Sequence, residues 1–128
     1  DALHFIFDFY NFSLDKSDYA DTTMELAYRL ENHYQNISAK MGYKIKPSES
    51  IINTLAYNAL YLNNLKLAEC FFKMNIENFP NSFNAFDSMG DYYNAIGNYE
   101  QAVIMYKNAL SISDNIETKR KLESIQKH

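Results

Sequence analysis

The strongest constraint on how this chain folds is an internal repeat with a 34-residue offset, which sets residues 52–59 in register with residues 86–93. The residues that match in this register are Leu55 with Met89, Ala56 with Gly90, Ala68 with Ala102, Phe72 with Tyr106 and Pro80 with Asp114. Repetition at this length indicates supersecondary units that stack, because one such unit alone cannot bury its apolar face.

Each repeat is expected to be a pair of helices joined by a tight turn. Proline and a capping hydroxyl precede each first helix, at residues 47–48 and 80–82. The pairs Asn63–Asn64 and Gly97–Asn98 tolerate the left-handed backbone that such a turn needs. The sequence therefore predicts helices over 49–62, 65–78, 83–96 and 99–111.

A further helix is expected on each side of the repeats. Upstream, Thr22 and Glu25 have capping-box spacing, and Gly42 ends a helix over 22–41. Its apolar face is expected to be Leu26, Leu30, Tyr34, Ile37 and Met41. Downstream, residues 116–126 carry a thin apolar stripe among charged residues, which predicts a cap helix at the end of a stack.

Composition favours one folded, helical domain. The 128 residues are 47% hydrophobic and include three glycines and two prolines, too few for the turns of an all-β fold. The net charge of −4, with scattered Lys and Arg, argues against nucleic-acid binding, and no apolar run is long enough to span a membrane. Because the chain begins at Asp1, we expect a piece of a longer protein. Residues 1–20 would end an upstream domain or form a linker, and residues 21–128 would form the repeat domain.

No catalytic or metal-binding motif is recognisable in the sequence. With glycine only at Gly42, Gly90 and Gly97, the chain has neither a G-x-S-x-G nucleophile elbow nor a phosphate-binding glycine loop. The three histidines lack metal-ligand spacing. We therefore expect no catalytic residue, no metal and no cofactor in this chain.

The repeat resembles the tetratricopeptide repeat over residues 49–114. The signature of that family is W-x2-L-G-x2-Y…A-x3-F…P on two antiparallel helices. The second repeat places Phe86, Gly90, Tyr93, Gly97, Tyr99, Ala102, Tyr106 and Ala109 at the expected positions. The first repeat departs from the signature at Ile52, Ala59 and Asn75. The resemblance implies an all-α fold, a right-handed stack of antiparallel helix hairpins (an α-solenoid) with about two repeats between an N-terminal helix and a C-terminal cap helix.

This arrangement gives the small and aromatic residues defined places. Small residues at positions 56, 68, 90 and 102 would let two helices approach closely. Phe72 and Tyr106 would fill the seam between hairpins, and Phe86, Tyr93 and Tyr99 are expected in the core of the second hairpin.

The resemblance also implies a concave groove lined by the first helix of each hairpin. Its lining residues would be Asn53, Tyr57, Tyr61, Asn84, Asp87, Asp91 and Asn94. Asp87 and Asp91 lie one helical turn apart with no basic residue near in sequence, which leaves a solvated acidic groove, a ligand-binding pair or a catalytic pair as interpretations. Two acids disfavour an acidic C-terminus and favour a basic or polar partner. Another domain of the protein, or residues 3–12, is an alternative occupant.

A second resemblance involves residues 32–38, 42–49 and 52–57. These stretches, NHYQNIS, GYKIKPSE and INTLAY, are similar to the C-terminal extension of bacterial α/β-hydrolase esterases of the siderophore-esterase type. In that family a helical repeat tail follows a serine hydrolase domain. The resemblance implies that residues 2–7 belong to the last hydrolase helix and that the catalytic serine, acid and histidine lie upstream of Asp1.

These observations lead to three expected functions. The first is a non-catalytic interaction module that binds a protein, a peptide or the upstream catalytic domain of its own chain. The second is a homo-oligomerisation domain that associates through Phe and Tyr faces. The third is a segment that gates or completes the active site of the parent esterase.

Overall fold

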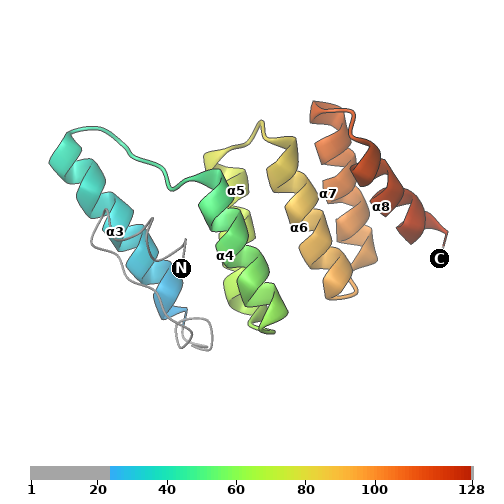
Figure 1. Ribbon diagram of the computed structural model, residues 1–128, viewed down its shortest axis with the longest axis horizontal. Helices are drawn as coiled ribbons and strands as arrows, with labels where there is room; N and C mark the ends of the chain where they lie inside the picture. Colours follow the sequence, from blue (N-terminus) through green and yellow to red (C-terminus); the bar gives the residue numbers. More distant parts are fainter. Residues whose placement is uncertain (1–23, 128) are drawn as a thin grey trace. The chain divides into compact units, whose positions relative to one another are not determined.

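The computed structural model describes residues 24–127, and over these residues the chain is α-helical with no strand. The helices are α3 (Glu25–Met41), α4 (Glu49–Tyr61), α5 (Leu65–Asn78), α6 (Phe83–Ala95), α7 (Tyr99–Ile112) and α8 (Ile116–Gln126), as Figure 1 shows in sequence colours. The all-α prediction is confirmed, and the predicted helices from residue 49 onward differ little from α4 to α8. The predictions for residues 1–20 lie outside the described residues.

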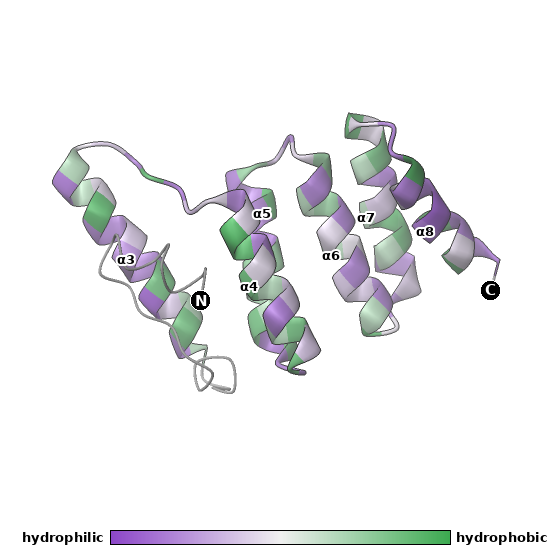
Figure 2. Cartoon of the chain, in the orientation of Figure 1, coloured by the Kyte–Doolittle hydropathy of each residue, from purple (hydrophilic) through white to green (hydrophobic). Residues whose placement is uncertain are grey.

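The described residues divide into two compact units, 24–71 and 72–127, with the boundary inside α5. We call these the N-terminal unit and the C-terminal unit and describe each by itself. In the C-terminal unit, α6 packs against α7, and α7 packs against α8. Figure 2 shows that α8 is largely hydrophilic, as the predicted cap helix requires.

The turn between α4 and α5 and the turn between α6 and α7 have the same conformation at the 34-residue offset. Asn63 and Gly97 both adopt the left-handed backbone, with φ of 62° and 83°. The matching hydrogen bonds are Asn64 N to Ala59 O and Asn98 N to Tyr93 O at 2.9 Å each, Asn63 N to Leu60 O at 3.0 Å, and Gly97 N to Asn94 O at 3.2 Å. The turns predicted at these positions are confirmed, and the repeat in sequence is also a repeat in local structure.

The buried positions follow the same repeat. The matched buried pairs are Leu55 and Met89, Ala56 and Gly90, Ala68 and Ala102, Phe72 and Tyr106, and Asn75 and Ala109. Gly90 is the tightest of these positions, because a Cβ atom placed on it would lie 2.5 Å from the ring of Tyr106. Its predicted role, to let a neighbouring helix approach, is therefore confirmed.

The aromatic core of the C-terminal unit differs from the prediction. Tyr99 is 55% exposed, because it is the first residue of α7 and lies at the edge of the hairpin. Phe86 and Tyr93 are only half-buried. The buried tyrosine of α6 is instead Tyr92, whose ring centroid lies 6.0 Å from that of Phe72. The signature positions of the repeat therefore predicted where the helices lie, but they did not predict which aromatic ring each helix buries.

Helix α3 also differs from the prediction at both ends. It begins at Glu25 with Met24 as its N-cap and no side-chain cap, whereas the prediction started it at residue 22. The predicted capping box involves Thr22, which lies outside the described residues. At the other end Met41 is 55% exposed, since it is the last residue before the αL cap at Gly42. The buried face is Leu26, Ala27, Leu30 and Tyr34.

The two serines predicted to cap the first helices behave differently. Ser82 caps α6, with its hydroxyl accepting from the Ala85 amide at 3.3 Å, whereas the Ser48 hydroxyl lies 3.2 Å from that of Ser50 and does not cap α4.

Ser82→Ala is expected to lower the free energy of unfolding by about 1 kcal/mol. Ser48→Ala is the matched control and should change it by less than about 0.5 kcal/mol. Equal losses in urea unfolding would contradict the assignment.

Candidate functional site

A cluster of polar side chains joins α6, α7 and α8 in the C-terminal unit. The ammonium of Lys121, on α8, lies between two carboxylates of α6 and donates to Asp87 Oδ2 at 2.8 Å and to Asp91 Oδ2 at 3.1 Å. The two aspartates lie one turn apart on α6, so their like charges face the same direction. Lys121 pairs with both carboxylates, offsets one of their two negative charges and ties α8 to α6.

The remaining carboxylate oxygens accept hydrogen bonds from two hydroxyls. The Thr118 hydroxyl donates to Asp87 Oδ1 at 2.7 Å, and the Tyr106 hydroxyl donates to Asp91 Oδ1 at 2.6 Å. The ammonium of Lys121 also lies 5.9 Å from the centroid of the Tyr106 ring, within the range of a cation–π contact. Every carboxylate oxygen of the pair therefore has a hydrogen-bond donor from α7 or α8.

The cluster is more deeply buried than an ordinary surface ion pair. Thr118 and Tyr106 are buried, and the side chains of Asp87 and Asp91 are 13% and 23% exposed. Burial by itself lowers the pKa of Lys121, but hydrogen bonds and charges from the two aspartates outweigh it, so the pKa is raised above its ordinary value. The expected solvated acidic groove is thus wrong at these two residues.

The 34-residue register locates the groups that the sequence interpretation missed. Thr118 and Lys121 occupy the positions of Asn84 and Asp87 one repeat later in the chain. Asn115 begins α8 by accepting from the amides of Glu117 and Thr118 at 3.0 and 3.1 Å. The basic partner of the two aspartates is distant in sequence, since Lys121 lies one repeat after Asp87.

The raised pKa gives a prediction for alkaline pH. When the pKa of a group is higher in the folded state than in the unfolded state, the charged group stabilises the fold. This contribution to the free energy of unfolding is complete below the unfolded-state pKa and is lost as the pH rises through the folded-state pKa. The melting temperature of the wild type should therefore fall more, between about pH 9 and about pH 11.5, than that of Lys121→Arg, whose guanidinium stays charged. Identical pH profiles would contradict the role given to Lys121.

The other predicted groove residues have different surroundings. In the N-terminal unit, Asn53 is half-buried, and its buried Oδ1 has no hydrogen-bond partner among the described residues. Tyr57 is half-buried and its ring centroid lies 6.3 Å from that of Tyr61, which is 80% exposed. These side chains offer aromatic and amide surface without charge.

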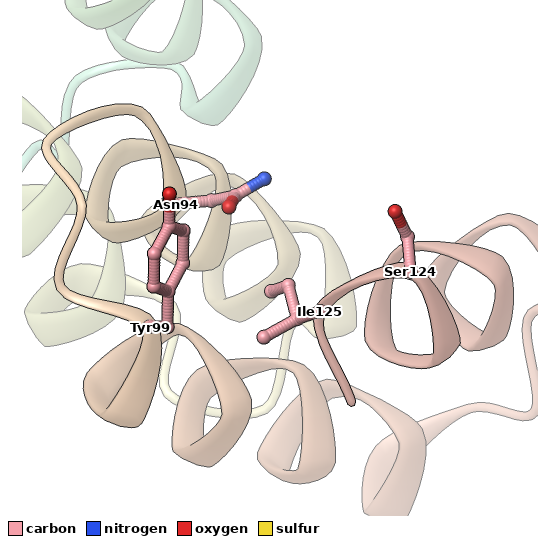
Figure 3. Close-up of a pocket in the computed structure, with 4 residues that line it drawn as sticks. All are labelled: Asn94, Tyr99, Ser124 and Ile125. Carbon is pink, nitrogen blue, oxygen red and sulfur yellow. The ribbon is translucent and has the colours of Figure 1, made fainter. Parts of the chain in front are cut away.

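In the C-terminal unit, two of the predicted residues remain open to solvent. Asn84 and Asn94 are both exposed on α6. Asn94 lines a recess of about 500 Å³ together with Tyr99, Ser124 and Ile125, which Figure 3 shows in close-up. The predicted set therefore separates into a largely buried charged pair and neutral side chains that are half-buried or exposed.

The described residues hold no group of three or more His, Cys, Asp and Glu side chains that could bind a metal ion. Burial lowers the pKa of His33, on α3, and its ring stacks edge-on against Tyr34 with centroids 5.4 Å apart. In residues 24–127, no helix has the length and apolar character needed to cross a bilayer.

No protein-family model matches the chain, and no curated protein matches it.

Proposed function

We propose that this chain is a non-catalytic helical-repeat module that binds another protein surface, in a stack of the tetratricopeptide type. The observation that carries the proposal is the 34-residue register, which recurs in the turns at Asn63 and Gly97 and in the buried positions of both repeats. The contact of Asp87 with Lys121 extends the register to α8, because these two residues are also separated by one repeat. Repeats of this kind provide extended surfaces for partners.

We propose that each unit binds through neutral side chains. Asp87 and Asp91 are engaged by Lys121, so recognition by the C-terminal unit rests on the exposed Asn84 and Asn94. The N-terminal unit separately offers Tyr61, which is 80% exposed, beside the half-buried Tyr57. Exposed tyrosines contribute large contact area at low entropic cost, and amides contribute directional hydrogen bonds. The partner should therefore offer a polar surface of low charge at these residues.

The first candidate partner is the upstream part of the same protein, which we propose to be an esterase domain of the α/β-hydrolase type. Isothermal calorimetry of this chain against that isolated domain tests the proposal, with saturable binding expected. Asn84→Arg should weaken binding by about tenfold or more, while Ser113→Arg, at the exposed end of α7, should leave it unchanged. Absence of binding heat at high concentration would contradict this assignment of the partner.

Two further roles have their own tests. Exposed apolar side chains such as Ile116, which is 64% exposed, favour self-association as a second candidate role. Light scattering would exclude this role if the chain stays monomeric at high concentration.

A gating role predicts altered ester hydrolysis when residues 21–128 are removed from the full-length protein. Unchanged kinetics would contradict that role.

A further inference from the structure

Helix α8 is attached to the rest of the C-terminal unit mainly by polar side chains. Its one buried residue is Thr118, while Lys121, Leu122 and Ile125 are half-buried. Figure 2 shows that the helix is largely hydrophilic, and its first residue, Ile116, is 64% exposed. A helix of 11 residues is only marginally stable by itself. The docking of α8 therefore depends on the polar cluster more than on an apolar face.

The groups that receive α8 are fixed by contacts between α6 and α7. The Tyr106 hydroxyl donates to Asp91 Oδ1 at 2.6 Å, and its ring packs closely on Gly90. Asp87 lies one turn before Asp91 on the same helix, so its carboxylate faces the same direction. Helices α6 and α7 thus hold two carboxylates beside an aromatic ring without any contribution from α8.

Lys121 lies among these groups as a bound cation would. Its ammonium donates to Asp87 Oδ2 at 2.8 Å and to Asp91 Oδ2 at 3.1 Å, and it lies 5.9 Å from the centroid of the Tyr106 ring. Carboxylates and an aromatic face together favour an alkylammonium group, through charge-assisted hydrogen bonds and a cation–π contact. The contact therefore shows the ligand chemistry that this surface of α6 and α7 accepts.

The charges of this cluster do not balance. Lys121 brings one positive charge to two carboxylates, and the cations beside it on α8 have partners elsewhere. Lys119 pairs with Asp114 at 2.6 Å, and Arg120 pairs with Glu117 at 2.9 Å. The two aspartates and Lys121 together carry a net negative charge, and release of α8 would leave the aspartates with two. This surface therefore attracts a basic segment of another protein.

We propose that Asp87, Asp91 and the Tyr106 ring form a binding site for a lysine side chain of a partner protein, and that α8 is an autoinhibitory helix that fills this site with Lys121. The inference rests on the proposed function, because it gives the binding module a second, acidic site that opens when α8 is displaced. Release of one helix while the rest of a unit stays folded is a local unfolding event.

The test uses the full chain and a fluorescein-labelled peptide with the sequence of residues 115–127, which carries the lysine in the context that the site is seen to accept. In the Lys121→Glu chain α8 is expected to be released, and fluorescence anisotropy should show saturable binding of the peptide. The wild-type chain should bind it about tenfold more weakly or worse, because its own α8 is tethered beside the site at a high effective concentration.

The matched controls test whether the lysine and the two aspartates carry the binding. A peptide with Lys121→Met keeps the length of the side chain without its charge and should bind the Lys121→Glu chain about tenfold more weakly or worse. A peptide with Lys119→Met should bind as well as the original peptide. Adding Asp87→Asn and Asp91→Asn to the Lys121→Glu chain should weaken binding to a similar extent as Lys121→Met in the peptide.

A measurement on the wild-type chain keeps the inference falsifiable if Lys121→Glu does not fold. Peptide at saturating concentration should lower the hydrogen-exchange protection of α8 and leave that of α6 and α7 unchanged. Unchanged protection of α8 overturns the inference, as does equal binding of the original and Lys121→Met peptides.

The remaining outcomes separate the inference from other accounts. A wild-type dimer that Lys121→Glu abolishes assigns the site to α8 of a second copy and overturns the inference. Failure of the peptide to bind, together with intact, Asn84-dependent binding of the upstream domain, overturns the inference but leaves the proposed function standing.

Discussion

Gly90→Ala is expected to lower the free energy of unfolding by about 1–2 kcal/mol, because overpacking of a core costs about 1–3 kcal/mol and exceeds the gain in helix propensity. The added Cβ would lie 2.5 Å from the Tyr106 ring. That ring is fully buried and its hydroxyl is held by Asp91, so it has little freedom to move away. Urea unfolding followed by circular dichroism measures the change.

The control for Gly90→Ala is Asn94→Ala, on the exposed face of the same helix. This substitution raises helix propensity without a clash and should stabilise the protein slightly or leave it unchanged. If Gly90→Ala were as stable as Asn94→Ala, the close approach of α7 to α6 would be contradicted.

Lys121→Glu is expected to release α8 from the C-terminal unit. The substitution replaces an ammonium at 2.8 and 3.1 Å from Asp87 and Asp91 with a third carboxylate. Hydrogen bonds to charged groups contribute about 1.5–3 kcal/mol, and we discount this to about 1–2 kcal/mol because the Lys121 side chain is 34% exposed. Amide hydrogen exchange should show loss of protection in α8 while α6 and α7 keep most of theirs.

Lys119→Glu is the matched charge reversal on the same helix. Lys119 pairs with Asp114 at 2.6 Å, but the side chains are 50% and 79% exposed. An exposed pair contributes less than about 1 kcal/mol, so α8 should stay protected. Equal deprotection by Lys119→Glu and Lys121→Glu would show that net charge, and not the cluster, controls docking.

The sequence was sufficient to predict the helices and turns of the repeat. Residues with strong local preferences, such as Gly97 in its left-handed turn and Asn115 before α8, act through their own backbone and need no knowledge of the packing. The 34-residue period then placed Gly90 against a neighbouring helix. These signals are local or periodic, and both kinds can be read from one sequence.

The chemistry of the candidate site could not be predicted in the same way. Whether Asp87 faces water or an ammonium depends on how α8 lies on α6, which the preferences of neither helix determine alone. Tyr92 and Tyr93 are adjacent aromatic residues, yet only Tyr92 is fully buried, because helix rotation decides which one faces the core. The repeat offset makes Asp87 and Lys121 equivalent positions of successive repeats, but only the packing of α8 shows that the two side chains meet.

The central claim is that the 34-residue register continues into α8 through the contact between Asp87 and Lys121. A double-mutant cycle with Asp87→Ala, Lys121→Ala and the double variant, measured by urea unfolding, tests it most directly. We predict a coupling energy of about 1–2 kcal/mol. This value is smaller than the total contribution of the hydrogen-bonded pair, because in Asp87→Ala the ammonium of Lys121 still binds Asp91. Additive effects, within about 0.3–0.5 kcal/mol, would contradict the claim.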